Sequence, residues 1–309
     1  MPHAFLEVQL RYRYITIKLL LLTLFSSVSF IQAKAQDDLL DMLEQQDTTS
    51  QTQRVLATFK GTRIINGHSV ELRTPSVLDF IISHRFGRLN SGAYEFFGLD
   101  EANVRLGLEY GLFNKVNIGI GRNSFEKTYD GFLKYKIIAQ TQVVPVSVVL
   151  FSSVAINTLK SPDPERELDF SNRLSYTYQA LIARKFNANF SLQLTPTIVH
   201  RNLVPTTRQA NDIYAIGIGG RQKLTRRMSI NAEYYYRLNP DPEPYHDSFA
   251  IGFDFETGGH VFQLHFSNSR SMIEKGFIAE TNGDIYNGDI HFGFNISRTF
   301  DLRADKNKK

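Results

Sequence analysis

The sequence contains no cysteine and no tryptophan, and its apolar runs are short. Without cysteine the chain has no disulfide framework, no thiolate metal site and no thiol nucleophile, so its stability depends on backbone hydrogen bonds and packing. No run approaches the ~20 apolar residues that a membrane-spanning helix needs. The H-E-x-x-H and G-x-S-x-G motifs are also missing, so neither a zinc protease nor a serine hydrolase of that type is indicated.

The first 35 residues are organised like a secretory signal peptide. Basic residues precede a short apolar run, and a small-x-small site follows it: Arg11, Arg13 and Lys18, then Leu19–Phe25, then Ala33-Lys34-Ala35. This order predicts cleavage before Gln36 and export from the cytoplasm. The alternative, a buried N-terminal helix, leaves the cleavage site unexplained.

The net charge gives little reason to expect an anionic partner. The whole chain has a formal net charge of +4 and a pI of about 9.1. Removal of residues 1–35 takes away Arg11, Arg13, Lys18, Lys34 and Glu7, which lowers the net charge to +1. Together with the export signal, this near-neutral balance argues against a nucleic-acid partner.

From Val77 onward the sequence alternates between apolar and polar residues, which is typical of strands with two different faces. One clear case sets Met228, Ile230, Ala232, Tyr234 and Tyr236 against Ser229, Asn231, Glu233 and Arg237. In the stretch VVPVSVVLF the alternation fails, so the facing of that strand stays open. We predict twelve strands: Val77–Phe86, Ala102–Gly111, Lys115–Arg122, Tyr129–Ala139, Val143–Asn157, Phe170–Lys185, Asn189–His200, Asp212–Lys223, Met228–Leu238, Ser248–Glu256, His260–Asn268 and Gly288–Phe300.

The links between these strands alternate between short and long. Short links are expected near 112–114, 141, 186–188, 224–227 and 257–259, with mostly longer ones between them. With twelve strands, every short turn then lies at one end, and so do both termini. An even strand number with short periplasmic turns and longer external loops is the plan of an antiparallel, up-and-down transmembrane β-barrel. The alternative, a soluble β-sandwich, has no reason to sort its loops in this way.

The two strand faces also differ in charge. An Arg or Lys that faces lipid at mid-bilayer costs about 2–4 kcal/mol, so the nearly pure apolar face is predicted to point outward. Inward charges line a conducting pore, or they neutralise one another in a closed lumen; twelve strands lie between the sizes typical of these cases. The predicted lumen-lining residues are Arg105, Glu109, Asp130, Lys134, Lys136, Arg173, Glu233, Arg237, Asp254, Gln263 and His265.

Three sequence segments are more specific than the residue alternation found in β-barrels generally: TFKGTRIINGHSVELRTP, VLDFIISHRFGRLNSGAYEFFGLDEANVRLGLEYGL and SFEKTYDGFLKYK. Through them the run from Thr62 to Phe300 resembles a family of β-barrel proteins of the Bacteroidota outer membrane that is catalogued as a domain of unknown function. The resemblance implies an outer-membrane barrel, and it implies no reaction, substrate or functional residue. The final strand, FGFNISRTF, also looks like an outer-membrane assembly signal, although a basic tail follows it.

Other candidate sites have simpler readings. The loops SPDPERELD and NPDPEPYHD offer clustered oxygens for Ca²⁺, but they lack an ordered ligand spacing and are better explained as stiff solvated loops. The glycine-rich GIGIGR and IGIGG lie inside strands and open no helix, so they are not phosphate loops. His265 near Ser267 or Ser269 is the only hint of a hydrolase. We therefore predict no catalytic, cofactor-binding or metal-binding residue, and no enzyme.

The predicted organisation has four parts: a signal peptide at 1–35, an N-terminal periplasmic segment at 36–76, the barrel at 77–300, and a basic tail at 301–309. Within the second part, Leu39, Leu40 and Leu43 have helical spacing. Three arrangements stay open for the stretch 51–76: a plug inside the lumen, a contact with a periplasmic partner, or a flexible tether.

The predicted protein is an outer-membrane β-barrel with porin-like passage of small solutes, or an accessory of a periplasmic protein. A non-conducting structural or binding barrel is the alternative, and a lipid-modifying barrel enzyme is the third. Its expected partners are outer-membrane lipid, the outer-membrane assembly machinery and a periplasmic protein.

Overall fold

The computed structural model describes residues 55, 57–160, 168–240, 245–257 and 260–303. The predicted signal peptide, the stretch around Leu39–Leu43, most of the SPDPERELD loop and most of the basic tail lie outside this part of the chain. No helix within it is long and apolar enough to cross a membrane.

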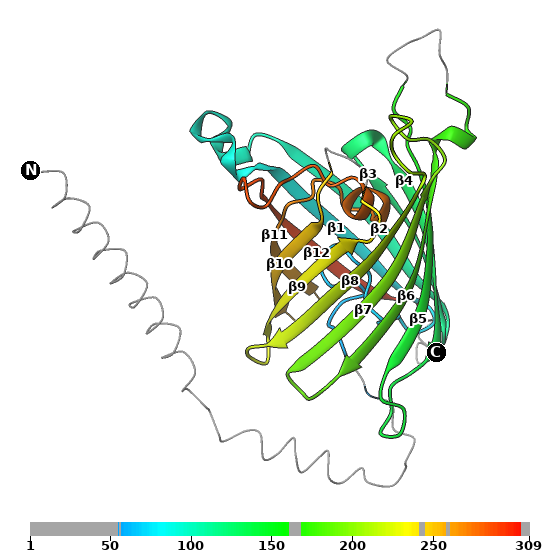
Figure 1. The fold of residues 1–309 in the computed structure, drawn as a ribbon. Helices are drawn as coiled ribbons and strands as arrows, with labels where there is room; N and C mark the ends of the chain where they lie inside the picture. The colour runs from blue at the N-terminus through cyan, green and yellow to red at the C-terminus, as the bar shows by residue number, and fades with distance from the viewer. Residues whose placement is uncertain (1–54, 56, 161–167, 241–244, 258–259, 304–309) are drawn as a thin grey trace, which may run out of the picture. The chain divides into compact units, whose positions relative to one another are not determined.

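Twelve antiparallel strands form a closed barrel (Figure 1). Each strand pairs with its neighbours in sequence, and β1 pairs with β12 to close the wall. The predicted all-β, up-and-down barrel is therefore confirmed. Its strands are β1 (Val77–Arg88), β2 (Ala102–Phe113), β3 (Val116–Asn123), β4 (Tyr129–Ile138), β5 (Ser147–Ile156), β6 (Leu174–Lys185), β7 (Phe190–Arg201), β8 (Asp212–Lys223), β9 (Met228–Arg237), β10 (Ser248–Thr257), β11 (His260–Ser267) and β12 (His291–Asp301).

In the part of the chain that the structure describes, five short helical turns lie in the loops at one end, which we call the long-loop end; the opposite end is the short-turn end. The turns are η2 (Leu89–Ser91), η3 (Ala93–Gly98), η4 (Phe125–Lys127), η5 (Ser171–Arg173) and η6 (Lys275–Ala279). The last of these is a single π-helical turn in the loop between β11 and β12.

The strand boundaries differ most from the prediction at β5 and β6, each of which begins four residues later than expected; β5 was expected to begin at Val143. It begins at Ser147, and residues 139–146 form a turn that is longer than predicted. Pro145 has no N–H to give to the ladder, and the Thr141 hydroxyl instead accepts hydrogen bonds from the N–H groups of Val143 and Val144. Residues 170–173 likewise form a turn before β6, so the predicted start of that strand was also too early.

The apolar stripe of the wall faces outward. In β2 and β3 the paired residues Leu108 and Ile120 are 38% and 63% exposed. Arg105 and Glu109, on the opposite parity of β2, are 1% exposed. Exposed apolar side chains around the middle of a closed barrel are expected to contact lipid, and buried charged side chains are expected to face the lumen.

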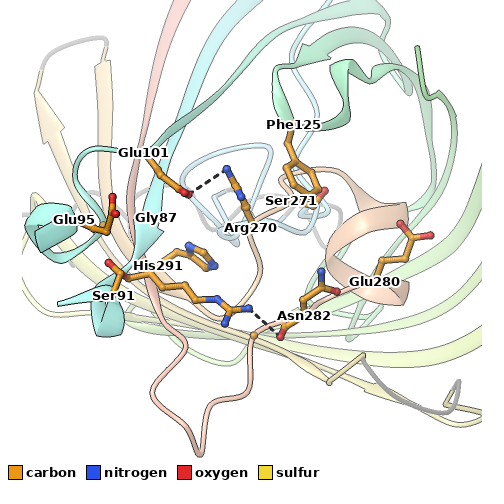
Figure 2. A pocket seen from close by; sticks show the side chains of 13 residues that line it. Gly87, Ser91, Glu95, Glu101, Phe125, Arg270, Ser271, Glu280, Asn282 and His291 are labelled. Carbon is orange, nitrogen blue, oxygen red and sulfur yellow. Dashed lines mark hydrogen bonds and ion pairs between the residues drawn. The ribbon is translucent and has the colours of Figure 1, made fainter. Parts of the chain in front are cut away.

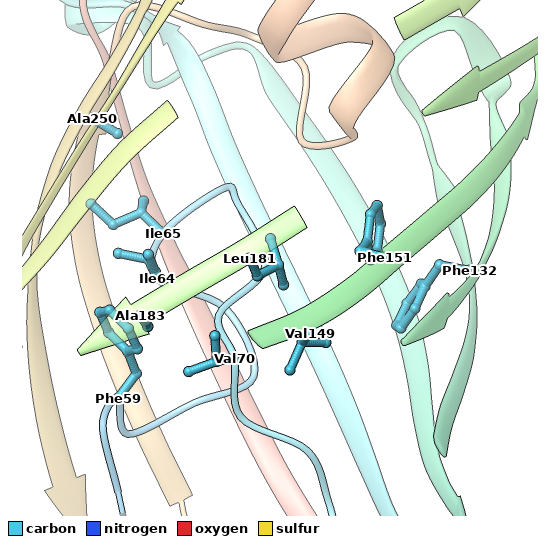
Figure 3. Packing of buried hydrophobic residues seen from close by; sticks show 10 residues of the cluster. All are labelled: Phe59, Ile64, Ile65, Val70, Phe132, Val149, Phe151, Leu181, Ala183 and Ala250. Carbon is cyan, nitrogen blue, oxygen red and sulfur yellow. The ribbon is translucent and has the colours of Figure 1, made fainter. Parts of the chain in front are cut away.

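Residues 57–76 lie inside the barrel, and we call them the plug. A tight turn organises them: Ile64 N–H donates to Gly67 O (2.8 Å), and Ser69 N–H donates to Thr62 O (2.9 Å). Residues 57–76 therefore fill part of the lumen, while residues 51–54 and 56 lie outside the described part of the chain. The apolar side chains of the plug pack on the inner wall of the barrel (Figure 3) in a cluster of Phe59, Ile64, Ile65 and Val70 with Phe132, Val149, Phe151, Leu181, Ala183 and Ala250.

This packing explains why VVPVSVVLF does not alternate. The outward residues of β5 face lipid, while Val149 and Phe151 point inward and are covered by the plug. Both faces of the strand are therefore apolar, for two different reasons.

The loop between β11 and β12, residues 268–290, also folds into the barrel, and we call it the inner loop. Its helical turn is seen inside the wall in Figure 1. The buried side chains of this turn pack against β7, β8 and β9 in a second cluster: Phe277, Ile278 and Ala279 with Val199, Ile213, Ala215 and Tyr235. The lumen is therefore filled by two segments, the plug and the inner loop.

The outward facing of β2 makes a depth-dependent prediction. Leu108→Arg places a charge in the middle of the lipid-facing stripe, and we expect it to lower the free energy of unfolding by about 2–4 kcal/mol. Phe113→Arg, at the end of the same strand, is the matched control and is expected to cost about 0–1 kcal/mol, because charges near the interface are tolerated. Denaturant titrations in lipid vesicles measure both. Equal costs at the two positions would contradict the assignment of this stripe to lipid.

Candidate functional site

The structure brings most of the predicted lumen residues together inside the wall. Those buried on the inward face are Arg105, Glu109, Asp130, Lys134, Glu233, Arg237, Asp254, Gln263 and His265. Lys136 is half-buried near the short-turn end of β4. Arg173 lies in the turn before β6 rather than in the strand, where it donates to the carbonyl oxygens of Asn157 and Leu159.

Buried charges of β2 and β4 form ion pairs that reach across β3, the strand that lies between them. The Arg105 guanidinium binds both carboxylate oxygens of Asp130, with Nε 3.0 Å from Oδ1. Lys134 Nζ lies 3.5 Å from Glu109 Oε1. The same ammonium donates to Thr62 O at 2.8 Å, so it binds the wall and the plug at once. A buried charge needs such partners to offset its lost hydration.

Glu233 on β9 is the main polar anchor of the plug. Its carboxylate accepts hydrogen bonds from three successive backbone N–H groups: Ile65 (3.3 Å), Asn66 (2.8 Å) and Gly67 (3.1 Å to Oε2). Glu233 is 4% exposed. Hydrogen bonds to an ionised acceptor are the strong kind, so this contact fixes the turn of the plug against the wall.

Amide side chains of the wall satisfy further backbone groups of the plug. Gln193 on β7 accepts from Val70 N–H at 3.0 Å and donates to His68 O at 2.8 Å. Irregular backbone at membrane depth is tolerated only where such partners exist. Two more plug carbonyls are bound in this way: Ile64 O by Gln263 Nε2 at 2.7 Å and Ile65 O by Asn295 Nδ2 at 3.2 Å.

Arg85 on β1 joins the plug to His265. Its Nη2 donates to Asn66 Oδ1 at 2.6 Å and lies 3.0 Å from His265 Nε2. Arginine can only donate, so His265 Nε2 is the acceptor and the ring proton is on Nδ1. The Ser267 hydroxyl is bound by Asn66 Nδ2 (3.4 Å) and Ser269 N–H (3.1 Å). Among the described residues, His265 is therefore not paired with a serine.

A cavity of about 300 Å³ opens at the long-loop end, between the β1–β2 loop and the inner loop (Figure 2). Arg270 reaches across it from the inner loop: its Nη2 lies 3.2 Å from Glu101 Oε2, and its guanidinium lies 5.3 Å from the centre of the Phe125 ring. Arg88 Nη1 lies 3.1 Å from Asp289 Oδ2. These contacts tie the two loops together at the mouth of the barrel.

Asp289 holds the far end of the inner loop. Burial alone would raise its pKa, but hydrogen bonds from Asn90 and from the Asp284 N–H, together with the charge of Arg88, outweigh it and lower the pKa of the Asp289 carboxyl. The carboxylate is thus stabilised in its charged form.

Among the described residues, no group of three or more His, Asp or Glu side chains is placed to hold a metal ion. Sequence reasoning found Glu233, Gln263 and His265 as lumen residues. It missed Gln193 and Arg85, which also hold the plug. Both stand on the polar parity of their strands, so the alternation that identified the other inward residues could have found them.

The sequence and the fold are both similar to those of known membrane β-barrels. A family model described as "Membrane bound beta barrel domain (DUF5777)" matches residues 59–300. No relative is found among the curated proteins. Similar solved structures include the NanC porin (9% identity, 73% of this chain and 100% of that chain, TM-score 0.47) and the KdgM porin (8%, 72% and 99%, 0.44). Another is outer membrane phospholipase A from Escherichia coli (13% identity, 78% and 100%, 0.44).

The family match covers all but the last residue of the barrel and most of the plug, and it confirms the predicted resemblance to a β-barrel family of unknown function. The chain belongs to the DUF5777 family of membrane-bound β-barrel domains.

Proposed function

We propose that the protein is a plugged outer-membrane channel that passes small solutes only when residues 57–76 leave the lumen. The observation that carries the proposal is the anchor at Glu233, where a wall carboxylate holds three backbone N–H groups of the plug. The short-turn end, from which the plug enters, is the periplasmic end in this proposal. The long-loop end then faces outside.

The chemistry of the contact supports a removable plug. Its polar ties are hydrogen bonds between wall side chains and backbone or side-chain groups of the plug, together with ion pairs of Lys60 with Glu256 and of Arg73 with Asp79. Among the described residues, the plug is joined covalently to the wall only by the chain itself, where it continues into β1. Water can replace each of these polar ties when the plug leaves, so the net contribution of one bond is about 0.5–1.5 kcal/mol, or about 1.5–3 kcal/mol where a charge takes part. The wall then exposes Lys134, Glu233, Gln193 and Gln263, which suit a solute-conducting surface.

A periplasmic partner fits the same scheme. Residues 36–56 precede the plug in the sequence, and Leu39, Leu40 and Leu43 are spaced for one face of a helix. A periplasmic protein that binds this stretch would pull on the plug through the chain itself. The solute channel and the accessory role are then two parts of one mechanism.

The two other functions receive less support. A permanently closed barrel would be served as well by an apolar filling, whereas here charged groups of the wall are committed to the plug backbone. A lipid hydrolase would need a free ring nitrogen on His265 beside a serine hydroxyl. His265 Nε2 instead accepts from Arg85, at 3.0 Å.

Removal of the Glu233 anchor should favour the open state. Glu233→Ala leaves three N–H groups without their acceptor, and a single buried unsatisfied group costs about 1–3 kcal/mol. Since about 1.4 kcal/mol is a tenfold change in an equilibrium, we expect at least a ~10-fold higher open probability in planar bilayers. Asp130→Asn is the control, because this buried carboxylate pairs with Arg105 of the wall and not with the plug. Equal currents from the two variants would count against the anchor.

A reversible lock tests whether the plug is the gate. The chain has no cysteine of its own, and the side chains of Asn66 and Ser267 face each other at 3.4 Å. In the Asn66→Cys, Ser267→Cys variant, also carrying Glu233→Ala, the oxidised protein should be closed and the reduced protein open. Each single-cysteine variant serves as control. A channel whose current does not change on oxidation is not gated by the plug.

A further inference from the structure

Departure of the plug alone would not open the lumen. The inner loop fills the part of the lumen nearer the long-loop end, where Phe277, Ile278 and Ala279 are buried against the wall. A channel gated only by residues 57–76 would still be blocked by this second segment. Any conducting state therefore needs the inner loop to move as well.

The two segments touch inside the barrel through Glu274. Its Oε1 lies 3.4 Å from Arg63 Nη1 and 3.4 Å from His68 Nε2, both of which belong to the plug. The side chains of Arg63 and Glu274 are 10% and 3% exposed, so this pair is shielded from water. Departure of the plug alone would leave the Glu274 carboxylate inside the barrel without its cationic partner Arg63, which the low-dielectric interior penalises.

A second tie runs through Arg85 of the wall. One nitrogen, Nη2, donates to Asn66 Oδ1 of the plug. The other, Nη1, donates to the carbonyl oxygens of Ser269 (2.5 Å) and Ser271 (3.0 Å) of the inner loop. The guanidinium is planar and rigid, so one side chain fixes the positions of both segments relative to each other.

We propose that the plug and the inner loop form one coupled gate, latched by Glu274 and Arg85, in which release of either segment releases the other. This inference rests on the proposed function and adds its regulation: a movement of the plug on its periplasmic side also moves the inner loop. Coupling of this kind acts in both directions. Ser271 and Arg270 also line the cavity at the long-loop end, so the same latch connects that cavity to the plug.

Two triggers, one on each side, can test the coupling. Glu233→Gln loosens only the plug, because the Glu233 carboxylate binds plug backbone groups. Glu280→Gln loosens only the inner loop, because Glu280 pairs with Lys275 of that loop and with Arg201 of β7. Asp130→Asn is the control, because the hydrogen bonds and the ion pair of Asp130 among the described residues go to Arg105 of the wall and to neither segment.

Single cysteines in this cysteine-free chain report the movement. Ser69→Cys reports on the plug, and Ala279→Cys reports on the inner loop; both side chains are fully buried. The full-length variants are reconstituted in lipid vesicles, and the rate of labelling by a hydrophilic maleimide is measured. Faster migration of the unboiled than of the boiled sample on a gel checks that each variant is folded.

Coupling predicts that each trigger raises labelling at both cysteines by at least ~10-fold, whereas Asp130→Asn raises neither. Adding Glu274→Gln cuts the direct bond between the two segments and leaves only the tie through Arg85, so Glu233→Gln should still raise labelling at position 69 and have a smaller effect at position 279. If each trigger affects only the cysteine on its own segment, the coupled gate is wrong and the removable plug stands. If Glu233→Gln raises neither cysteine, the removable plug and the coupling fall together.

Discussion

The whole architecture depends on one constraint: away from bulk water, every backbone N–H and C=O needs a partner. In the wall, the strand ladder meets this demand, and the pairing of β1 with β12 leaves no open edge toward lipid. Residues 57–76 and the inner loop are irregular, so their own backbones cannot satisfy it. They are placed inside the wall, where Glu233, Gln193, Gln263 and Arg85 supply the missing donors and acceptors.

The inner surface of the wall is divided between two tasks. On β4 to β6 and on β7 to β9, apolar inward residues such as Phe151 and Ile213 supply contact area for the plug and the inner loop. Charged and amide side chains of the inner surface fix the orientation of the two segments by directed hydrogen bonds. Apolar burial is nondirectional, so it gives affinity, while the polar ties decide where each segment is held.

The alternation of residues was sufficient to predict the wall, because lipid and lumen select opposite chemistry at every second position. It placed Arg105 and Glu109 inside and Leu108 outside, as the structure has them. It failed at Arg173, since the parity was counted from a strand start that lies too early.

The plug could not be predicted in the same way. The partner of Glu233 is a set of backbone N–H groups about 167 residues away in the chain, as the separation from Asn66 shows, and every residue type carries such groups. The failure of alternation in VVPVSVVLF was the signal that something apolar covers the inner face of β5.

Barrel size links these features. Eight strands enclose a lumen that wall side chains fill, and 16–18 strands leave an open channel. Twelve strands enclose more space than their own inward residues occupy, so a sealed membrane requires added segments. A lumen of this width must be filled by the plug and the inner loop, and it also leaves a passage once these two segments move. Because two segments share the lumen, a movement of only one of them does not open a passage. A direct bond between them, such as that of Glu274 to Arg63, is the simplest way to make their movements one event.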